Sequence, residues 1–91
     1  MTTNHPEAGE KIFKKGEVIY QQGDYVTAIF DVLWGQVALY VDYHKPTQRL
    51  LNEVEADGFF GIVGFLESRP QNATAVALEK TACMVITHES F

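Results

Sequence analysis

The stretch from Phe59 to Thr74 reads FFGIVGFLESRPQNAT, and its order of residue types is the most specific in the chain. It is too rich in glycine for a central strand and too short for a long helix, so it predicts a turn that feeds one helical turn. Gly61 has two interpretations here: it permits a tight turn beneath Phe59 and Phe60, or it lets an anion approach backbone N–H groups. The spacing matches neither the dinucleotide-binding glycine pattern nor a phosphate-binding loop that ends in Gly-Lys-Ser/Thr.

Short β-rich runs separated by turn residues surround this stretch and predict an all-β roll, sandwich or barrel. Residues 28–34 alternate between two faces, with Ala28, Phe30, Val32 and Trp34 on one of them. With residues 37–41 they predict a tight hairpin around Gly35. Further strands are expected at 11–15, 17–20, 49–54, 73–78 and 81–87, with 49–54 returning to 37–41 after a turn at 44–48.

The composition indicates a packed domain and argues against several kinds of partner. Of 91 residues, 46% are apolar, and seven Lys plus Arg against twelve Asp plus Glu give a net charge of -5. The basic residues are scattered, and Lys14-Lys15 is the one adjacent pair. Direct binding to nucleic acid or to an anionic membrane requires a basic stripe, so we expect neither. No apolar run could span a bilayer and no secretory signal is visible, so we expect a cytoplasmic protein.

The sequence does not indicate an enzyme, a metal site or a cofactor. His5, His44 and His88 are isolated, whereas a metal centre needs several convergent ligands. Ser68 and Ser90 have no histidine and carboxylate nearby in a catalytic motif. The single cysteine, Cys83, lies in an apolar run and is expected to be a small buried hydrophobe.

Four segments, taken in order, resemble the cyclic nucleotide-binding domain family, the β-roll of the catabolite activator protein and of kinase regulatory subunits. These segments are residues 13–24, 29–37, 59–61 and 69–74, and the resemblance covers roughly residues 11–91. It implies an all-β, antiparallel double-stranded β-roll, similar to a jelly roll, with a short helical turn in a phosphate-binding cassette near residues 60–74. Residues 1–10 are then expected to be a flexible polar leader. The family's C-terminal lid helices would be lacking.

Two side chains of the family's cassette are replaced in this sequence. The resemblance implies a Glu that holds the ribose 2'-hydroxyl and an Arg that pairs with the cyclic phosphate, but Ile62 and Gln71 stand at those positions. A lost charge-assisted contact forfeits about 1.5 to 3 kcal/mol, and a buried hydroxyl without its partner costs about 1 to 3 kcal/mol more. Together, roughly 3 to 6 kcal/mol weakens binding by about two to four decades.

The sequence therefore predicts a small regulatory ligand-binding module with weak or altered recognition of cyclic nucleotides. The ligand would be a cyclic nucleotide or another small anion, with Gly61 permitting the turn, the Ile62 and Val63 amides facing the anion, and Gln71 and Asn72 donating neutral hydrogen bonds. The complete set of expected ligand-binding residues is Phe60, Gly61, Ile62, Val63, Arg69, Gln71, Asn72 and Thr74. Arg69 either swings toward the ligand or is a solvated loop charge. The alternative function is a protein–protein interaction or oligomerisation module, acting as a homodimer or with a partner protein, whose pocket is vestigial.

Overall fold

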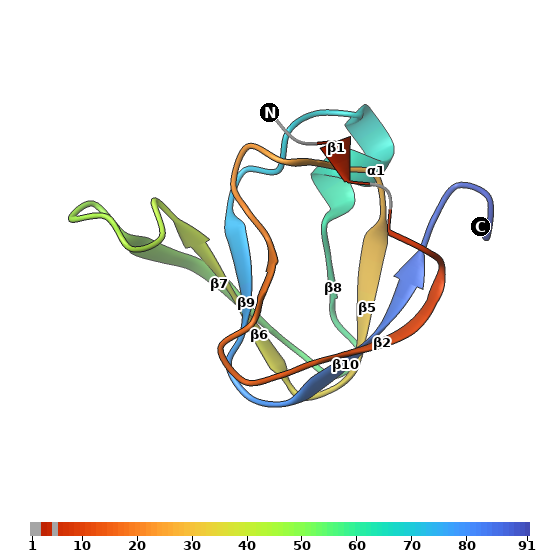
Figure 1. Ribbon diagram of the computed structural model, residues 1–91, viewed down its shortest axis with the longest axis horizontal. Helices are drawn as coiled ribbons and strands as arrows, with labels where there is room; N and C mark the ends of the chain where they lie inside the picture. Colours follow the sequence, from red (N-terminus) through yellow and green to blue (C-terminus); the bar gives the residue numbers. More distant parts are fainter. Residues whose placement is uncertain (1–2, 5) are drawn as a thin grey trace.

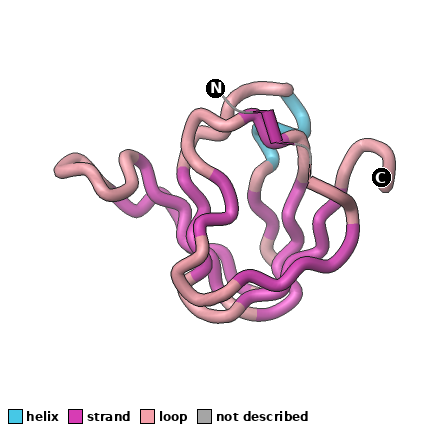
Figure 2. Tube along the Cα trace, viewed as in Figure 1, coloured by secondary structure: helices cyan, strands magenta, loops and turns pink. Residues whose placement is uncertain are grey.

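A computed structural model describes residues 3–4 and 6–91, with the side chains described from Pro6 onward. Two four-stranded sheets face each other, as Figures 1 and 2 show, and strand dominates the chain. The first sheet has the order β2-β10-β5-β8, and the second has the order β3-β9-β6-β7. Every pairing within these two sheets is antiparallel, so the all-β, double-stranded β-roll that was expected is confirmed.

The strands and the helix have the following bounds: β1 Thr3–Asn4, β2 Gly9–Phe13, β3 Val18–Tyr20, β4 Tyr25–Val26, β5 Ile29–Trp34, β6 Gln36–Val41, β7 Arg49–Glu55, β8 Phe59–Phe60, α1 Ile62–Glu67, β9 Thr74–Ala77 and β10 Thr81–Ile86. Strands β1 and β4 form a separate parallel pair. Within the segment expected to be a polar leader, Thr3–Asn4 and the start of β2 at Gly9 are strand. A domain boundary at residue 11 stays a prediction, and His5 lies outside the described residues.

The hairpin expected around Gly35 is wrong, whereas the one between β6 and β7 is confirmed. β5 pairs with β10 and β8, but β6 pairs with β7 and β9, so the chain changes sheets at Gly35. Gly35 has φ +100°, and a Cβ there would lie 2.6 Å from the Cα of Thr81. The glycine therefore serves a corner between the two sheets, because only a residue without a side chain fits against β10.

The core lies between the two sheets and is built from alternate strand residues. Phe30 and Val32 of β5 are buried, as their alternation predicts, while Trp34 at the end of that strand is exposed. Tyr20, Phe30 and Phe60 form an aromatic cluster, and the Phe30 and Phe60 rings stack at 4.9 Å between centroids. This cluster holds β3, β5 and β8 together immediately before the cassette begins.

Cys83 on β10 is fully buried, as expected. Burial raises the pKa of its thiol to about 11, and the negative charge of Asp31 adds to this effect. The thiol is therefore neutral at physiological pH and acts as a core side chain.

Candidate functional site

Helix α1 forms where the glycine-rich stretch predicts one helical turn, and it closes one end of the roll (Figure 1). Gly61 precedes the helix with φ +83°, and a Cβ there would lie 2.8 Å from the carbonyl oxygen of Ala28. The residue before the helix must therefore be glycine for both conformational and steric reasons. This supports the first interpretation of Gly61, in which it permits the turn.

A cavity of about 350 Å³, largely open to solvent, lies beside the start of α1 and is lined from both sheets. Its walls are Tyr20, Leu39, Leu51, Asn52, Phe59, Phe60, Gly61, Ile62, Val63, Gln71 and Asn72. Six of the eight residues expected to bind a ligand line this cavity: Phe60, Gly61, Ile62, Val63, Gln71 and Asn72. Their roles toward a ligand stay predictions.

Gln71 is only 3% exposed, and its side chain is engaged with the backbone of the roll. Its amide nitrogen, Nε2, donates to the carbonyl oxygens of Val26 at 3.0 Å and Gly61 at 3.3 Å. The backbone of Gln71 also exchanges two hydrogen bonds with the loop at Gly23 and Asp24. The amide N–H groups that were expected to reach a ligand thus satisfy carbonyls that connect α1 to β4.

Gly64 in α1 accommodates this arrangement. A Cβ at that position would lie 2.4 Å from Nε2 of Gln71 and would collide with the carbonyl oxygen of Val26. Gln71, Gly64 and Val26 therefore form one close-packed contact between the cassette and β4.

The two remaining expected site residues lie away from the cavity. Arg69 is exposed, and its guanidinium Nη1 lies 2.8 Å from Oε1 of Glu67, which agrees with the interpretation of Arg69 as a solvated loop charge. Thr74 is buried in β9, and its Oγ1 accepts a hydrogen bond from the backbone N–H of Gln22 at 3.0 Å. Thr74 lines a different, larger groove of about 510 Å³, together with Gln22, Tyr43, His44 and Lys45.

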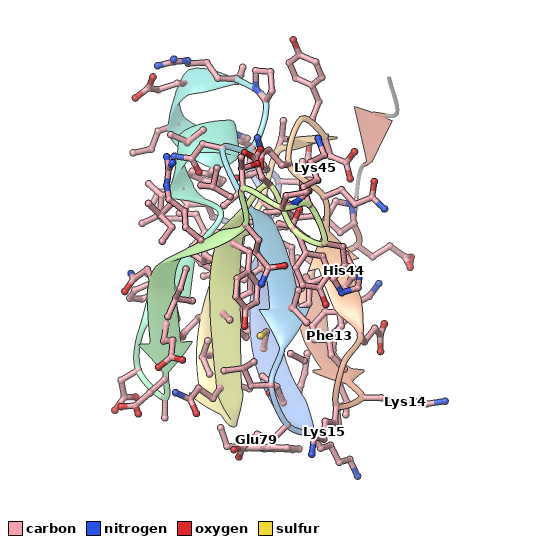
Figure 3. All side chains as sticks on the ribbon, turned by 90° about the vertical axis from the view of Figure 1, so that its left-hand side faces the viewer. Phe13, Lys14, Lys15, His44, Lys45 and Glu79 are labelled. Atoms are coloured by element: carbon pink, nitrogen blue, oxygen red, sulfur yellow. The ribbon has the colours of Figure 1, made fainter. Side chains whose placement is uncertain are left out.

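The cavity has no cationic side chain among the residues whose side chains are described, 6–91. His44 and Lys45 lie along the other groove, and Lys14 and Lys15 lie at the end of the molecule opposite α1 (Figure 3). His88 stacks on Phe65 at 4.1 Å between ring centroids, and its Nε2 lies 2.9 Å from the Phe65 carbonyl oxygen. An anion in the cavity would therefore meet neutral donors alone.

Sequence reasoning did not identify five residues as part of this cavity: Tyr20, Leu39, Leu51, Asn52 and Phe59. Leu39 and Leu51 come from β6 and β7, which pair with each other. Strand parity places Tyr20 and Leu39 on the inner face, and this could have marked them as lining residues. The bulge in the β6–β7 ladder between Leu39 and Tyr40 changes the alternation along β7, so the sequence does not show which β7 side chains face inward.

Within residues 3–4 and 6–91, no three His, Cys, Asp or Glu side chains are grouped so that they could hold a metal ion. Nor does any helix of this described part have the length and hydropathy needed to cross a membrane.

The model of the family described as "Cyclic nucleotide-binding domain" matches residues 10–91. A cGMP-dependent protein kinase of Plasmodium berghei is 31% identical over 74 residues, which cover 81% of this chain and 8% of the kinase. A cAMP-dependent protein kinase regulatory subunit of Dictyostelium discoideum is 28% identical over 82 residues, covering 87% of this chain and 25% of the subunit. The chain thus spans a quarter or less of the length of these two relatives.

The solved structures agree with the sequence matches. The crystal structure of the catabolite activator protein of Thermus thermophilus superposes with a TM-score of 0.84 at 26% identity, over 91% of this chain and 39% of that one. The two sheets, the short helix after Phe60 and the matched range thus all point to one family. The chain belongs to the cyclic nucleotide-binding domain family.

Proposed function

We propose that this chain is a regulatory ligand-binding module whose recognition of cyclic nucleotides is weak or altered. The family assignment supports a regulatory binding domain, and the relatives with kinase or regulatory-subunit names are much longer than the matched region. One observation carries the proposal of altered recognition: among residues 6–91 no cationic side chain lines the cavity beside α1, and Gln71, which replaces the expected Arg, gives its amide N–H groups to two backbone carbonyls.

The energetic consequence follows from the loss of charge-assisted contacts. A cyclic phosphate transferred from water to a cavity without a positive charge loses hydration that neutral donors replace only in part. Ile62 stands where a carboxylate would accept the ribose hydroxyl, and an isoleucine side chain accepts no hydrogen bond. Binding weakened by about two to four decades places cyclic nucleotide affinity at roughly 0.1 mM or weaker, when a micromolar site is the reference.

Thermal-shift measurements test this proposal with cyclic AMP and cyclic GMP, each at 50 to 100 µM, and with inorganic phosphate as the control anion. We expect an increase in Tm of at most about 3 °C, because a ligand at or below its Kd stabilises the folded state by less than about 0.5 kcal/mol. A larger increase with either cyclic nucleotide, absent with phosphate, would contradict the proposal.

A second candidate function is an interaction or oligomerisation module, and the exposed leucines of β7 favour it. β7 is an edge strand of its sheet, and Leu50 and Leu51 are each 50% exposed. Light scattering over a range of protein concentrations distinguishes the two functions. A mass that rises with concentration, together with no thermal shift for any nucleotide or small anion, would favour the interaction module. A cytoplasmic location also remains part of the proposal.

A further inference from the structure

We propose that the cavity beside α1 binds an uncharged, mainly apolar small molecule with one hydrogen-bond acceptor. This acceptor takes a hydrogen bond from the Tyr20 hydroxyl. This inference rests on the proposed function, because it concerns the same cavity and assigns the class of ligand. The ligand class proposed here differs from the small anion that the sequence predicted, since the lining favours an uncharged molecule.

The size and lining of the cavity are the first observation. About 350 Å³ lies within the range of small-molecule sites, which are lined mostly by apolar and aromatic side chains with a few polar groups. Here the apolar lining comprises Leu39, Leu51, Phe59, Phe60, Ile62 and Val63. Phe59 and Ile62 are exposed, so the opening of the cavity is apolar as well as its floor. A ligand that covers these side chains removes apolar surface from water, and each Å² of apolar surface buried contributes about 25 cal/mol of favourable free energy.

The charge of the lining is the second observation. No Lys, Arg, His, Asp or Glu lines the cavity among residues 6–91. Arg69, the cation nearest in sequence, forms its ion pair with Glu67 on the surface. A charged ligand would lose hydration without gaining a partner of opposite charge, whereas an uncharged ligand avoids this cost.

The Tyr20 hydroxyl is the third observation. Tyr20 lines the cavity, is 4% exposed, and packs its ring against Phe30 and Phe60. Among residues 6–91 its hydroxyl makes no hydrogen bond, yet no fully buried side-chain oxygen there lacks a partner. A hydroxyl that is neither bonded nor fully buried needs an open space to face, and the cavity beside α1 is one that Tyr20 lines. Burial raises the pKa of Tyr20, so the hydroxyl keeps its proton and is free to donate it to an acceptor on a ligand.

The other polar groups of the lining are less available. Asn52 is exposed, so water competes for its amide N–H groups, and Nε2 of Gln71 is engaged with two carbonyls. Asn72 also lines the cavity and is exposed, so water competes for its amide. Tyr20 is thus the side-chain donor of the lining that an acceptor on a ligand gains most from meeting.

Two fluorescent probes test the site with the full chain: prodan, an uncharged naphthalene dye with a ketone, and phenylnaphthylamine, an uncharged dye without a carbonyl. We expect both to bind and to shift their emission toward that of an apolar solvent. Ile62→Glu places a carboxylate in the lining and should weaken both probes by about tenfold or more. Leu66→Glu is the matched control, because Leu66 lies on the same helix, is 68% exposed and does not line the cavity. It should change either affinity by less than about twofold.

Tyr20→Phe tests the hydrogen bond separately. Loss of one neutral hydrogen bond should weaken prodan by about two- to tenfold and leave phenylnaphthylamine unchanged. Circular dichroism of each variant verifies the fold. If Tyr20→Phe does not fold, the wild-type preference for prodan over its analogue with the ketone reduced to a hydrocarbon gives the same information.

The outcomes separate this inference from the proposed function. Absence of probe binding by the wild type, or equal losses in Ile62→Glu and Leu66→Glu, overturns the inference and leaves the proposed function standing. Equal effects of Tyr20→Phe on both probes overturn the role of Tyr20. Displacement of prodan by low-micromolar cyclic AMP overturns the proposed function, and the inference with it.

Discussion

The side-chain amide of Gln71 donates a 3.0 Å hydrogen bond to the backbone carbonyl oxygen of Val26, and the same nitrogen lies 3.3 Å from the carbonyl oxygen of Gly61. The Val26 contact crosses 45 residues of sequence and connects the cassette to β4, and the Gly61 contact crosses 10 residues within the cassette. The position that the family resemblance assigns to phosphate recognition thus supports the roll itself in this chain.

Replacing Gln71 by alanine should lower the free energy of unfolding by about 2 to 4 kcal/mol, because two buried carbonyls lose their donor and a buried side chain is removed. Urea denaturation measures the change. Asn72→Ala is the matched control, since Asn72 is an exposed amide side chain at the next position, and it should change stability by less than about 0.5 kcal/mol. Equal effects of the two substitutions would refute the structural role of Gln71.

Gly61→Ala should destabilise the domain more than Gly16→Ala, although the two glycines share nearly the same backbone conformation. Their φ values are +83° and +84°, so both variants should lose about 1 kcal/mol from strain. A Cβ at Gly61 meets the Ala28 carbonyl at 2.8 Å, whereas one at Gly16 meets nothing within 4 Å. The collision should cost Gly61→Ala about 1 to 3 kcal/mol in addition. Thermal unfolding of both variants measures the difference. Equal Tm values would show that the Ala28 carbonyl leaves room for a Cβ at position 61.

Thr74→Val should lower stability by about 1 kcal/mol, because the backbone N–H of Gln22 loses the Thr74 hydroxyl as its acceptor. Thr74→Ser retains the hydroxyl and should recover most of this loss. Neither variant should alter binding of an uncharged probe beside α1, because Thr74 lines the other groove. A change in probe affinity with Thr74→Val alone would place Thr74 in the binding machinery after all.

Stability should decline as the pH rises from about 9 toward 11, in part through Cys83. Burial raises the pKa of this thiol to about 11 from 9.0, so the folded state holds its proton more tightly than the unfolded state does. The stabilisation is complete below pH 9 and is lost as the pH rises through the folded value. Cys83→Ala should flatten the dependence of unfolding free energy on pH over this interval. An unchanged slope would mean that other groups determine the loss of stability at alkaline pH.

The sequence predicted the longer strands and the short helix, because β-rich runs and turn residues are local signals, but it did not predict the two-residue strands β1, β4 and β8. The pairing between sheets was not local, and this explains the error at Gly35. A glycine between two alternating runs is compatible with a hairpin or with a corner, and the choice depends on β10, almost 50 residues later in the chain.

The candidate site was predicted in part for the same reason. Residues 60–63, 71 and 72 line one cavity because they lie at the start of a single short helix or soon after its end. Thr74 lies two residues beyond Asn72, but the strand that begins there turns its hydroxyl toward Gln22. Gln71 could not be recognised as structural, because its partners at Val26 and Gly61 are brought together only by the fold.

Isothermal titration calorimetry with cyclic AMP, on the wild type beside Ile62→Glu plus Gln71→Arg, tests the central claim most directly. The claim is that this domain retains the family's backbone while its cavity lacks the groups that hold ribose and phosphate. We expect a wild-type Kd of about 0.1 mM or weaker, and an affinity at least about 100-fold higher in the double variant. Binding by the wild type with a Kd in the low micromolar range would contradict the claim.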